Sequence, residues 1–398
     1  MASIAGNPNA ILEEIYVEKV KLDEEERDKS NRIIEFIREV LIRRMCENNG
    51  FFNTMYRELY YTGSSYDGLK ICEPDEYDLN LNLDPKIPEL RIIRDEGCKP
   101  GYVLYGFYKE VLPKYMLNPF SQEVLQLIKK MKNKYVMDPN KVKRWVQDIL
   151  NETLPSLRNQ FGHYGILDVE VNGDGTALTL NVISKSGHYV DVDLVPVFNI
   201  KGERVKKKHY PQLWDAVQNT KKMFKEGAKR AFRRRVNIAI REECRLIPKV
   251  DKNNRGLLYW HLNFRHVENQ ILMDKQCAKK VIKLLKYLRD CNQDQIGELF
   301  SYCLKTIVVQ LILDDPNDDW NNRELANYFL KALKFLTKKL ECGKIEDTEY
   351  IFGSGSTLFY EKTPGSMKKM VRWLNGVIQD LEQSMFQPNC ENVWNSYF

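Results

Sequence analysis

Residues 61–83 read YTGSSYDGLKICEPDEYDLNLNL, and this stretch decides how the fold and the chemistry are interpreted. The flanking runs 56–61 and 77–83 have the patterning of strands on either side of a turn. Side chains at alternate positions of a strand face the same side, so Glu76 and Asp78 present two carboxylates next to each other. Such a pair repels itself unless a hard cation lies between the two groups, and oxygen ligands in this arrangement suit Mg²⁺.

Two other segments add to this candidate site. Gly63 permits a backbone geometry in which peptide N–H groups and the Ser64 hydroxyl can meet phosphate oxygens. Farther along the chain, residues 190–196 read VDVDLVP, an apolar strand in which Asp191 and Asp193 face one side. Acidic groups in a strand otherwise suited to burial are costly without a compensating cation or partner. Either aspartate could supply a third carboxylate.

The order of elements predicts an α+β protein with a mixed catalytic lobe followed by an all-helical lobe. Residues 12–45 have the spacing of a long amphipathic helix, with a break expected near 28–31. A hairpin is predicted where Asn172-Gly173-Asp174-Gly175 joins strands 169–171 and 177–183, and a further strand covers 189–198. Later patterning is helical, over 278–288, 296–313, 323–340 and 365–383. The run GSGS at 353–356 has no comparable strand behind it, so we interpret it as a loop.

Composition excludes several classes of protein. The chain has 398 residues, of which 43% are hydrophobic and 29% charged, as in folded soluble proteins. The longest apolar run, 306–313, is far too short to span a bilayer. The first ten residues lack the features of a secretory signal, and the nine cysteines are scattered without a C-x-x-C pair. We therefore expect a cytoplasmic protein with reduced thiols and no membrane partner.

Four motifs together resemble cyclic GMP-AMP synthase and its animal relatives, the cGAS-like receptors. They are TGSSYDGLKI at 62–71, EYDL at 76–79, VDLVPV at 192–197 and WHLNFRHVE at 260–268. Their order and spacing match over nearly the whole chain. The resemblance implies a bilobed nucleotidyltransferase fold, with an N-terminal spine helix in residues 1–50, a nucleotidyltransferase core in 51–268 and a C-terminal helical lobe in 269–398.

The resemblance also assigns roles to individual residues. Glu76, Asp78 and Asp193 would form the catalytic triad that binds Mg²⁺ or Mn²⁺, with Asp191 as the rival for the third position. Nucleotide contacts would come from two places, the turn with Gly63, Ser64 and Ser65, and the helical lobe with Lys286, Ser301 and Tyr302. There the lysine and Ser301 would hold donor phosphates and the tyrosine would stack on a base.

The implied reaction is two-metal nucleotidyl transfer that joins ATP and GTP into a cyclic dinucleotide of the cyclic GMP-AMP type, in an innate immune sensor. The product would act on a cyclic-dinucleotide receptor. Three alternatives remain: a DNA-activated cyclic dinucleotide synthase, a synthase of linear oligonucleotides, and a catalytically silent nucleic-acid-binding relative. Intact Gly63, Ser64, Glu76, Asp78 and Asp193 argue against the silent form.

The charge distribution points to a nucleic-acid activator. Although the whole chain carries only +6, residues 199–245 contain 15 Lys and Arg against 5 Asp and Glu, a net +10, so the remainder carries −4. One-sided clustering of this kind is typical of phosphate-backbone binding. The residues that we expect to contact nucleic acid are Lys206, Lys207, Lys208, Lys229, Arg230, Arg233, Arg234 and Arg235.

The resemblance also indicates which nucleic acid. The vertebrate DNA sensor carries a His-Cys-Cys-Cys zinc insertion after the segment that matches 260–268, whereas this chain continues to a single Cys277. Members without this zinc thumb include sensors of double-stranded RNA, whose A-form shape and 2′-hydroxyls are read without sequence. We therefore predict a double-stranded RNA activator over DNA, and leave open a dimer on the nucleic acid.

Overall fold

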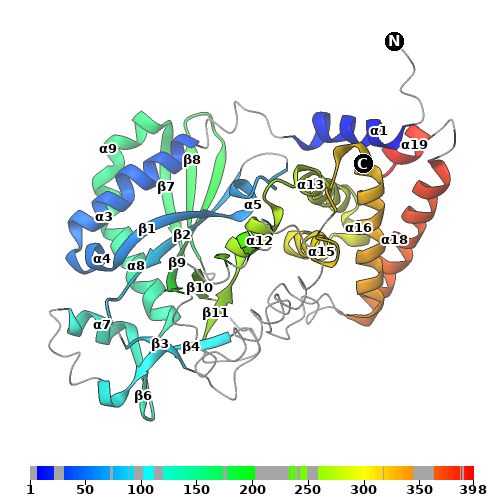
Figure 1. Cartoon of the computed structure of the whole chain (residues 1–398). Helices are drawn as coiled ribbons and strands as arrows, with labels where there is room; N and C mark the ends of the chain where they lie inside the picture. The colour runs from blue at the N-terminus through cyan, green and yellow to red at the C-terminus, as the bar shows by residue number, and fades with distance from the viewer. Residues whose placement is uncertain are drawn as a thin grey trace.

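The computed structural model has a lobe built on a mixed β-sheet and a lobe of helices (Figure 1). This arrangement confirms the expected α+β class. The structure describes residues 7–21, 31–71, 75–87, 89–93, 102–111, 120–173, 177–201, 232, 234–236, 238–239, 243–248, 259–316, 318–343, 363–385, 387 and 390–398. The residues that line the site come from both lobes.

The sheet has eleven strands, with the principal order β1-β2-β9-β10-β11-β4-β6-β5. Strand β3 pairs with β4, and β7 and β8 extend the sheet from β9. The bounds are β1 Tyr56–Thr62, β2 Glu76–Leu83, β3 Arg91–Ile93, β4 Tyr102–Tyr108, β5 Ile128–Met131, β6 Lys134–Met137, β7 Ile166–Asn172, β8 Leu178–Ser184, β9 Tyr189–Lys201, β10 Glu243–Pro248 and β11 Trp260–Asn263.

Among the described strands, β2 and β9 form the one parallel pair, and they carry the acidic motifs. The register sets Glu76 opposite Asp191 and Asp78 opposite Asp193. The hairpin expected at 172–175 is confirmed by the antiparallel pairing of β7 with β8. Strand β8 then pairs with β9 along its other edge, so the acidic part of β9 is held on both sides.

The helices of the sheet lobe pack against its strands or against one another. They are α3 Ile42–Asn48, α4 Gly50–Met55, α7 Ser121–Leu127, α8 Pro139–Thr153 and α9 Arg158–Phe161, with the 3-10 turns η3 Lys109–Val111, η4 Leu154–Leu157 and η5 Gly162–Tyr164. Helix α8 begins where the Asp138 side chain accepts hydrogen bonds from the backbone N–H groups of Asn140 and Lys141, and Pro139 occupies its first turn. Its buried residues include Val142, Val146 and Ile149, which form one helical face.

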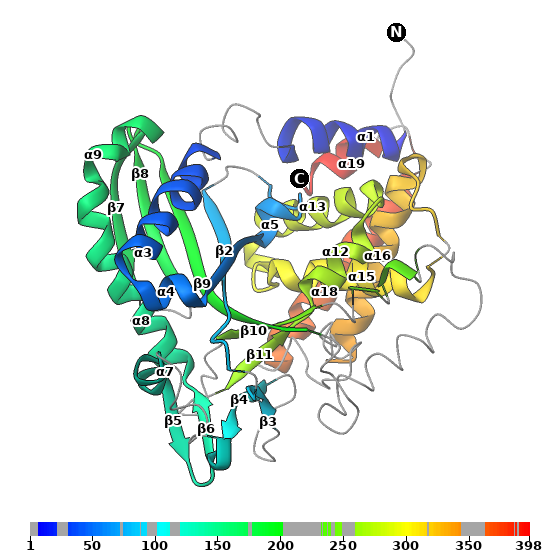
Figure 2. The ribbon, with the colours of Figure 1, turned by 60° about the vertical axis from the view of Figure 1, so that its left-hand side comes forward.

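The predicted spine is present as two helical segments. Helix α1 spans Pro8–Ile15 and continues through a π-helical turn, η1 Tyr16–Val20. Helical backbone is found again over 31–35, through η2 Phe36–Leu41 and into α3, while residues 22–30 lie outside the described part. The two segments lie on different lobes, with α1 beside α13 and α19 and α3 over the sheet (Figures 1 and 2).

The helical lobe consists of α12 Arg265–Leu272, α13 Gln276–Cys291, α14 Gln293–Ile296, α15 Ser301–Asp314, η7 Asn322–Glu324, α16 Leu325–Glu341, α18 Pro364–Ser384 and α19 Cys390–Asn395. Helix α15 is at its centre, because every residue from Cys303 through Leu313 is buried. The single helix expected over 296–313 is wrong: Phe300 is extended and separates α14 from α15.

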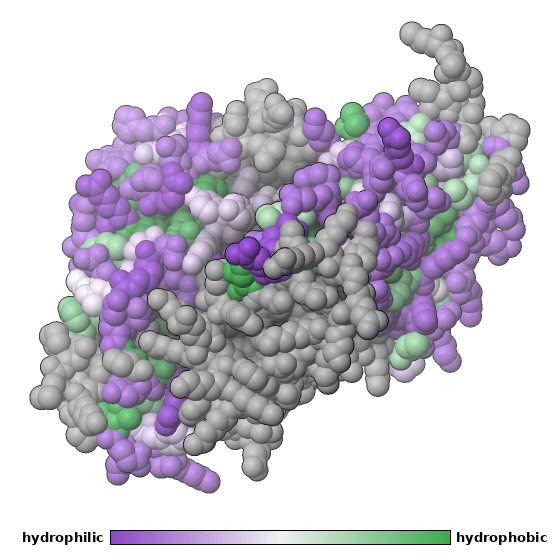
Figure 3. Space-filling view, viewed as in Figure 1, coloured by the Kyte–Doolittle hydropathy of each residue, from purple (hydrophilic) through white to green (hydrophobic). Residues whose placement is uncertain are grey.

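Hydrophilic residues dominate the described surface on the face shown in Figure 3. The described residues include no helix that has both the length and the apolar character needed to cross a membrane. The connection from α12 to α13 contains only residues 273–275, and Cys277 is buried just after it.

Candidate active site

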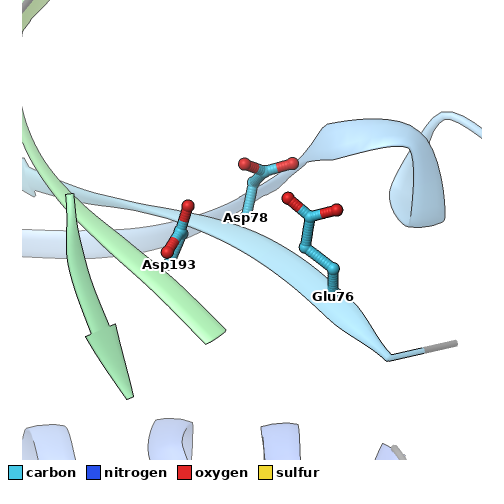
Figure 4. A group of neighbouring side chains, drawn as sticks. All are labelled: Glu76, Asp78 and Asp193. Atoms are coloured by element: carbon cyan, nitrogen blue, oxygen red, sulfur yellow. The ribbon is translucent and has the colours of Figure 1, made fainter. Parts of the chain in front are cut away.

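The acidic residues of β2 and β9 come together at the end of the parallel pair. Oxygens of Glu76, Asp78 and Asp193 all lie within 4.8 Å of one another, and they are the one such group of metal-ligating side chains among the described residues. Figure 4 shows the three carboxylates pointing toward a common space, two from β2 and one from β9. The period of a strand places the first two on one face, and the register with β9 brings the third beside them.

The two aspartates of β9 differ in their surroundings. Asp191 is exposed, and its carboxylate accepts a hydrogen bond of 2.7 Å from the Asn181 side chain. Asp193 accepts one of 2.6 Å from the Thr179 hydroxyl, and its carboxylate lies in the group of three. Of the two candidates, the geometry therefore favours Asp193 as the third carboxylate.

The group is short of positive charge. Burial and the neighbouring carboxylates raise the pKa of Glu76, against a lowering effect of Lys70. Burial also raises the pKa of Asp78, with Asp193 acting in the same direction and Arg265 in the other. The Lys70 ammonium is 3.9 Å from Glu76 Oε2 but only 2.7 Å from the neighbouring Asp75. Carboxylates that repel one another in this way are a suitable site for a divalent cation.

The turn before β2 brings backbone close to the carboxylates. Helix α5, Gly63–Tyr66, begins directly after β1, and Gly63 has a φ of 82°. A Cβ atom at Gly63 would lie 1.9 Å from Asp78 Oδ2. Glycine is required here for two reasons, because the backbone conformation disfavours other residues and the space is taken by the Asp78 side chain.

We therefore expect Gly63→Ala to abolish nucleotidyl transfer, because the added methyl group must displace the Asp78 carboxylate. The strained φ alone should cost roughly 1–2 kcal/mol of unfolding free energy. Gly68→Ala is the matched control, since Gly68 also has a positive φ, of 71°, but an added Cβ would meet no atom within 4 Å. Product formation and urea denaturation of both variants are the measurements, and similar activities for the two would contradict the interpretation.

The two serines of the turn differ in position. Ser64 lines the cavity between the lobes. The Ser65 hydroxyl donates to the backbone oxygen of Glu76 at 3.1 Å, which ties α5 to the start of β2. The Thr62 hydroxyl donates to the backbone oxygen of Asp78 in a similar way, also at 3.1 Å. These bonds hold the turn beside the carboxylates and leave Ser64 facing the cavity.

The helical lobe contributes the other predicted nucleotide contacts, and all three line the same cavity. Lys286 is buried and donates to the backbone oxygen of Leu69 at 2.8 Å. Burial lowers the pKa of Lys286 to about 8, helped by Arg289 and Lys70. The charged form of a buried lysine is poorly solvated. An anionic ligand therefore stabilises it more than it would stabilise an exposed lysine.

Ser301 and Tyr302 stand at the start of α15. The Ser301 hydroxyl accepts a hydrogen bond of 2.9 Å from Arg289, and the Tyr302 hydroxyl donates to Glu268 at 2.7 Å. Tyr302 is nevertheless 38% exposed, and it lines the cavity. Stacking of a base on this ring stays a prediction.

A buried ionic cluster that the sequence analysis missed joins the two lobes. The Asp67 carboxylate, just after α5, accepts hydrogen bonds of 2.8 Å from Arg265, 2.8 Å from Asn269 and 2.9 Å from Lys305. Lys305 also lies 2.9 Å from Glu268. Burial acts to raise the pKa of Asp67, but Lys305 and Arg265 more than offset it and lower the pKa to about 2. A lysine within the otherwise apolar run of α15 was the available sequence signal.

The cavity that holds these groups has a volume of about 550 Å³ and is lined from both lobes. Its lining residues are Thr62, Gly63, Ser64, Asp67, Leu69, Glu76, Asp78, Asn80, Val195, Ile247, Pro248, His261, Asn263, Phe264, Arg265, Glu268, Ile282, Lys286, Ser301, Tyr302 and Lys305. This volume is within the range of small-molecule sites. A cavity with carboxylates on one wall and a lysine on the other can bind a metal and the phosphates of a nucleotide together.

Most of the predicted nucleic-acid contacts lie outside the described residues. These are Lys206, Lys207, Lys208, Lys229, Arg230 and Arg233. Arg234 is exposed. The Arg235 guanidinium donates to Gln270 O at 3.0 Å and to Asp274 at 2.8 Å, so it also fastens the end of α12. The loop expected at 353–356 lies outside the described residues as well.

Comparison with known proteins identifies relatives along nearly the full chain. Residues 65–274 match the family described as Mab-21 protein nucleotidyltransferase domain, and 277–376 match the Mab-21 protein HhH/H2TH-like domain. A cyclic GMP-AMP synthase-like receptor of Aethina tumida is 26% identical over 392 residues, which cover 95% of this chain and 89% of that protein. One of Tribolium castaneum is 24% identical over 398 residues, with 96% and 90% covered. The cyclic GMP-AMP synthase of Sus scrofa is 24% identical over 380 residues, with 90% and 68% covered.

Proposed function

Because the chain belongs to the Mab-21 nucleotidyltransferase family, we propose that it joins ATP and GTP into a cyclic dinucleotide of the cyclic GMP-AMP type when double-stranded RNA binds. The observation that carries the proposal is the group of Glu76, Asp78 and Asp193 beside the Gly63 turn in a cavity shared by two lobes. Relatives named as cyclic GMP-AMP synthase-like receptors support the choice of product class. The biological role that follows is innate immune sensing, with the product acting on a cyclic-dinucleotide receptor.

The residues of the site fit a divalent cation. Three carboxylates converge within 4.8 Å, and the pKa values of two are raised by burial and repulsion. Oxygen donors of this kind match Mg²⁺ or Mn²⁺. Bound there, the metal would supply charge neutralisation at the reacting phosphate and at the pyrophosphate that leaves.

The protein's own groups provide positioning. Gly63 and Ser64 lie beside the carboxylates, where peptide and hydroxyl donors can meet a triphosphate. Lys286, on the opposite wall, adds a cation whose pKa of about 8 would rise when phosphate binds. The ion cluster at Asp67 joins the turn after β1 to α12 and α15. It therefore fixes the distance between the parts of the two lobes that line the cavity. Alignment of the attacking hydroxyl with the leaving group is the main requirement of phosphoryl transfer.

The choice of RNA rests on the absence of a zinc-binding insertion. The chain passes from α12 to α13 within three residues, 273–275, where a cysteine-rich thumb would have to lie. Double-stranded RNA presents a regular A-form backbone that basic residues read by shape. The basic block at 199–245 supplies the charge for such a contact.

One experiment tests the reaction and the activator together. The purified chain is incubated with ATP, GTP and Mg²⁺, alone or with matched RNA or DNA duplexes, and products are identified by mass spectrometry and linkage-specific nucleases. A cyclic product that forms only with RNA is expected. Stimulation by DNA alone would overturn the RNA assignment, linear products alone would overturn the cyclic assignment, and no product under any condition would favour a silent binding protein.

Charge reversal in the basic block should separate RNA binding from catalysis. We expect Lys206→Glu, Lys207→Glu and Lys208→Glu, combined with Arg234→Glu, to weaken duplex binding and reduce its dependence on salt. Arg235 is left unchanged because its guanidinium holds α12. Mobility shifts at several salt concentrations measure the effect, with melting temperature as the control for folding. Unchanged affinity in the folded variant would exclude the block as the activator surface.

A further inference from the structure

One end of the cavity lies over the sheet and differs in character from the end that faces α13 and α15. Its lining residues are Asn80, Val195, Ile247, Pro248, His261 and Asn263, from strands β2, β9, β10 and β11. Apolar walls with a few polar groups are typical of pockets that hold a flat organic ring. None of these six residues carries a carboxylate, an ammonium or a guanidinium.

Asn80 is the polar group of this end whose side chain lacks a protein partner. The residue is 7% exposed and lines the cavity, and no hydrogen bond of its amide is found within the part of the chain that the structure describes. Two nearby asparagines do have side-chain hydrogen bonds, since the Asn82 amide nitrogen donates to Glu58 and the Asn263 side chain accepts from the backbone of Arg265, although the Asn82 oxygen is itself without a partner among the described residues. Because Asn80 lines the cavity and its amide has no protein partner within the described ranges, both its donor and its acceptor are free to bond to a ligand.

Its position relates it to the reaction centre. Asn80 follows Asp78 by two residues on β2, so both side chains face the same side of the sheet. Two residues of strand correspond to roughly 7 Å. In a nucleotide, the ribose ring separates the ribose hydroxyls from the base. If such a hydroxyl lies at the carboxylates, the base therefore lies over the side chain of Asn80.

We propose that Asn80 determines base specificity by pairing its amide with the N6 and N7 edge of an adenine. The inference rests on the proposed nucleotidyl transfer and adds the identity of the base at this end. An asparagine amide donates to N7 and accepts from the N6 amino group of adenine. Guanine presents two acceptors on the corresponding edge, which suit an arginine or lysine. The six lining residues of this end include no arginine or lysine. Arg265, elsewhere in the lining, is bound to Asp67.

The test removes single atoms from the nucleotide and from the protein. 7-Deaza-ATP lacks N7 and should show kcat/KM roughly 5- to 150-fold below that of ATP in the unchanged protein. In Asn80→Leu the ratio of kcat/KM for ATP to kcat/KM for 7-deaza-ATP should fall to about 1. Asn80→Asp should also lose it, because the donor to N7 is gone. Asn82→Leu, on the same strand face but outside the cavity lining, should keep the preference even if it lowers stability.

Calorimetric binding of ATP and 7-deaza-ATP with Ca²⁺ in place of Mg²⁺ gives a second readout that needs neither activator nor turnover. Protein that binds ATP with this discrimination but makes no product would retain the Asn80 assignment and overturn the proposed synthesis. If Asn80→Leu lowered the affinity and kcat/KM for ATP and for 7-deaza-ATP by the same factor, the assignment would be overturned. It would also be overturned if the unchanged protein, but not Asn80→Leu, discriminated between GTP and 7-deaza-GTP while neither discriminated between ATP and 7-deaza-ATP.

Discussion

Replacing Asp78 by Asn is expected to reduce nucleotidyl transfer by at least about 10³-fold while the protein stays folded. Changes around metal ligands already cost roughly 10- to 100-fold, and a lost ligand in a group of three should cost more. The side chain keeps its shape, so its contact with Gly63 is preserved. Loss of activity would then report the charge and the ligand atom, not a collapsed turn.

Stability should change in the opposite direction. Burial and Asp193 disfavour the ionised form of Asp78 in the folded protein. Removing this charge relieves repulsion, so Asp78→Asn should melt at the same temperature as the unchanged protein or slightly above it. Added Mg²⁺ should raise the melting temperature of the unchanged protein and have little effect on the variant.

Asp191→Asn is the matched control. Asp191 is on the same strand face as Asp193 but bonds to Asn181 and lies outside the group of three. The control should keep most of its activity, as measured by product formation at saturating ATP and GTP. Equal losses in the Asp78 and Asp191 variants, or full activity in the Asp78 variant, would refute the assignment of the site.

The pair Glu76 and Asp78 could be predicted from sequence because strand periodicity is local. The choice between Asp191 and Asp193 could not be made from the residues themselves, since both have the same parity on β9. What distinguishes them is the pairing of β9 with β2, a contact between segments more than a hundred residues apart, together with the hydrogen bonds that each aspartate receives from β8. Sequence pattern thus located the candidate metal site, whereas the choice of its third carboxylate depended on the register of the sheet.

Other features depend on how the lobes dock. The partners of Asp67 come from α12 and α15, about two hundred residues later in the chain, and no periodicity indicates them. The sequence places Lys305 in a largely apolar helical run without indicating a role, yet its side chain is only 7% exposed and lies between two carboxylates. Asn80 is a polar position of an alternating strand, and its place in the lining of the cavity follows only from the packing of the two lobes.

The Asp67 cluster should make a large contribution to stability. We expect Asp67→Ala to lower the free energy of unfolding by about 3–5 kcal/mol, the usual cost of removing one partner from a buried ion pair. The carboxylate is 1% exposed, and its loss leaves Lys305 and Arg265 with less compensation. Because Asp67 directly follows α5, the turn at Gly63 should also lose order, and synthesis should fall with stability. Urea denaturation monitored by circular dichroism gives the free energy.

Two comparisons identify the source of that loss. Asp75→Ala removes a 62% exposed carboxylate that pairs with Lys70, and such a surface pair should contribute about 1 kcal/mol or less. Combining Asp67→Ala with Lys305→Met should recover part of the lost stability, since the stranded charge is removed as well. A double variant no more stable than Asp67→Ala would contradict a direct coupling between the two residues.

The pH dependence provides an independent check on the same cluster. The pKa of Asp67 is about 2 in the folded protein against 3.8 ordinarily. As the pH falls, the unfolded chain is therefore protonated at this residue before the folded protein is. The stabilisation from this carboxylate is therefore complete above about pH 4 and is lost as the pH falls toward 2. Asp67→Asn should show a shallower fall in stability over that interval than the unchanged protein. Identical slopes would mean that the carboxylate is not held in its charged form by Lys305 and Arg265, and that the lobes are joined by packing alone.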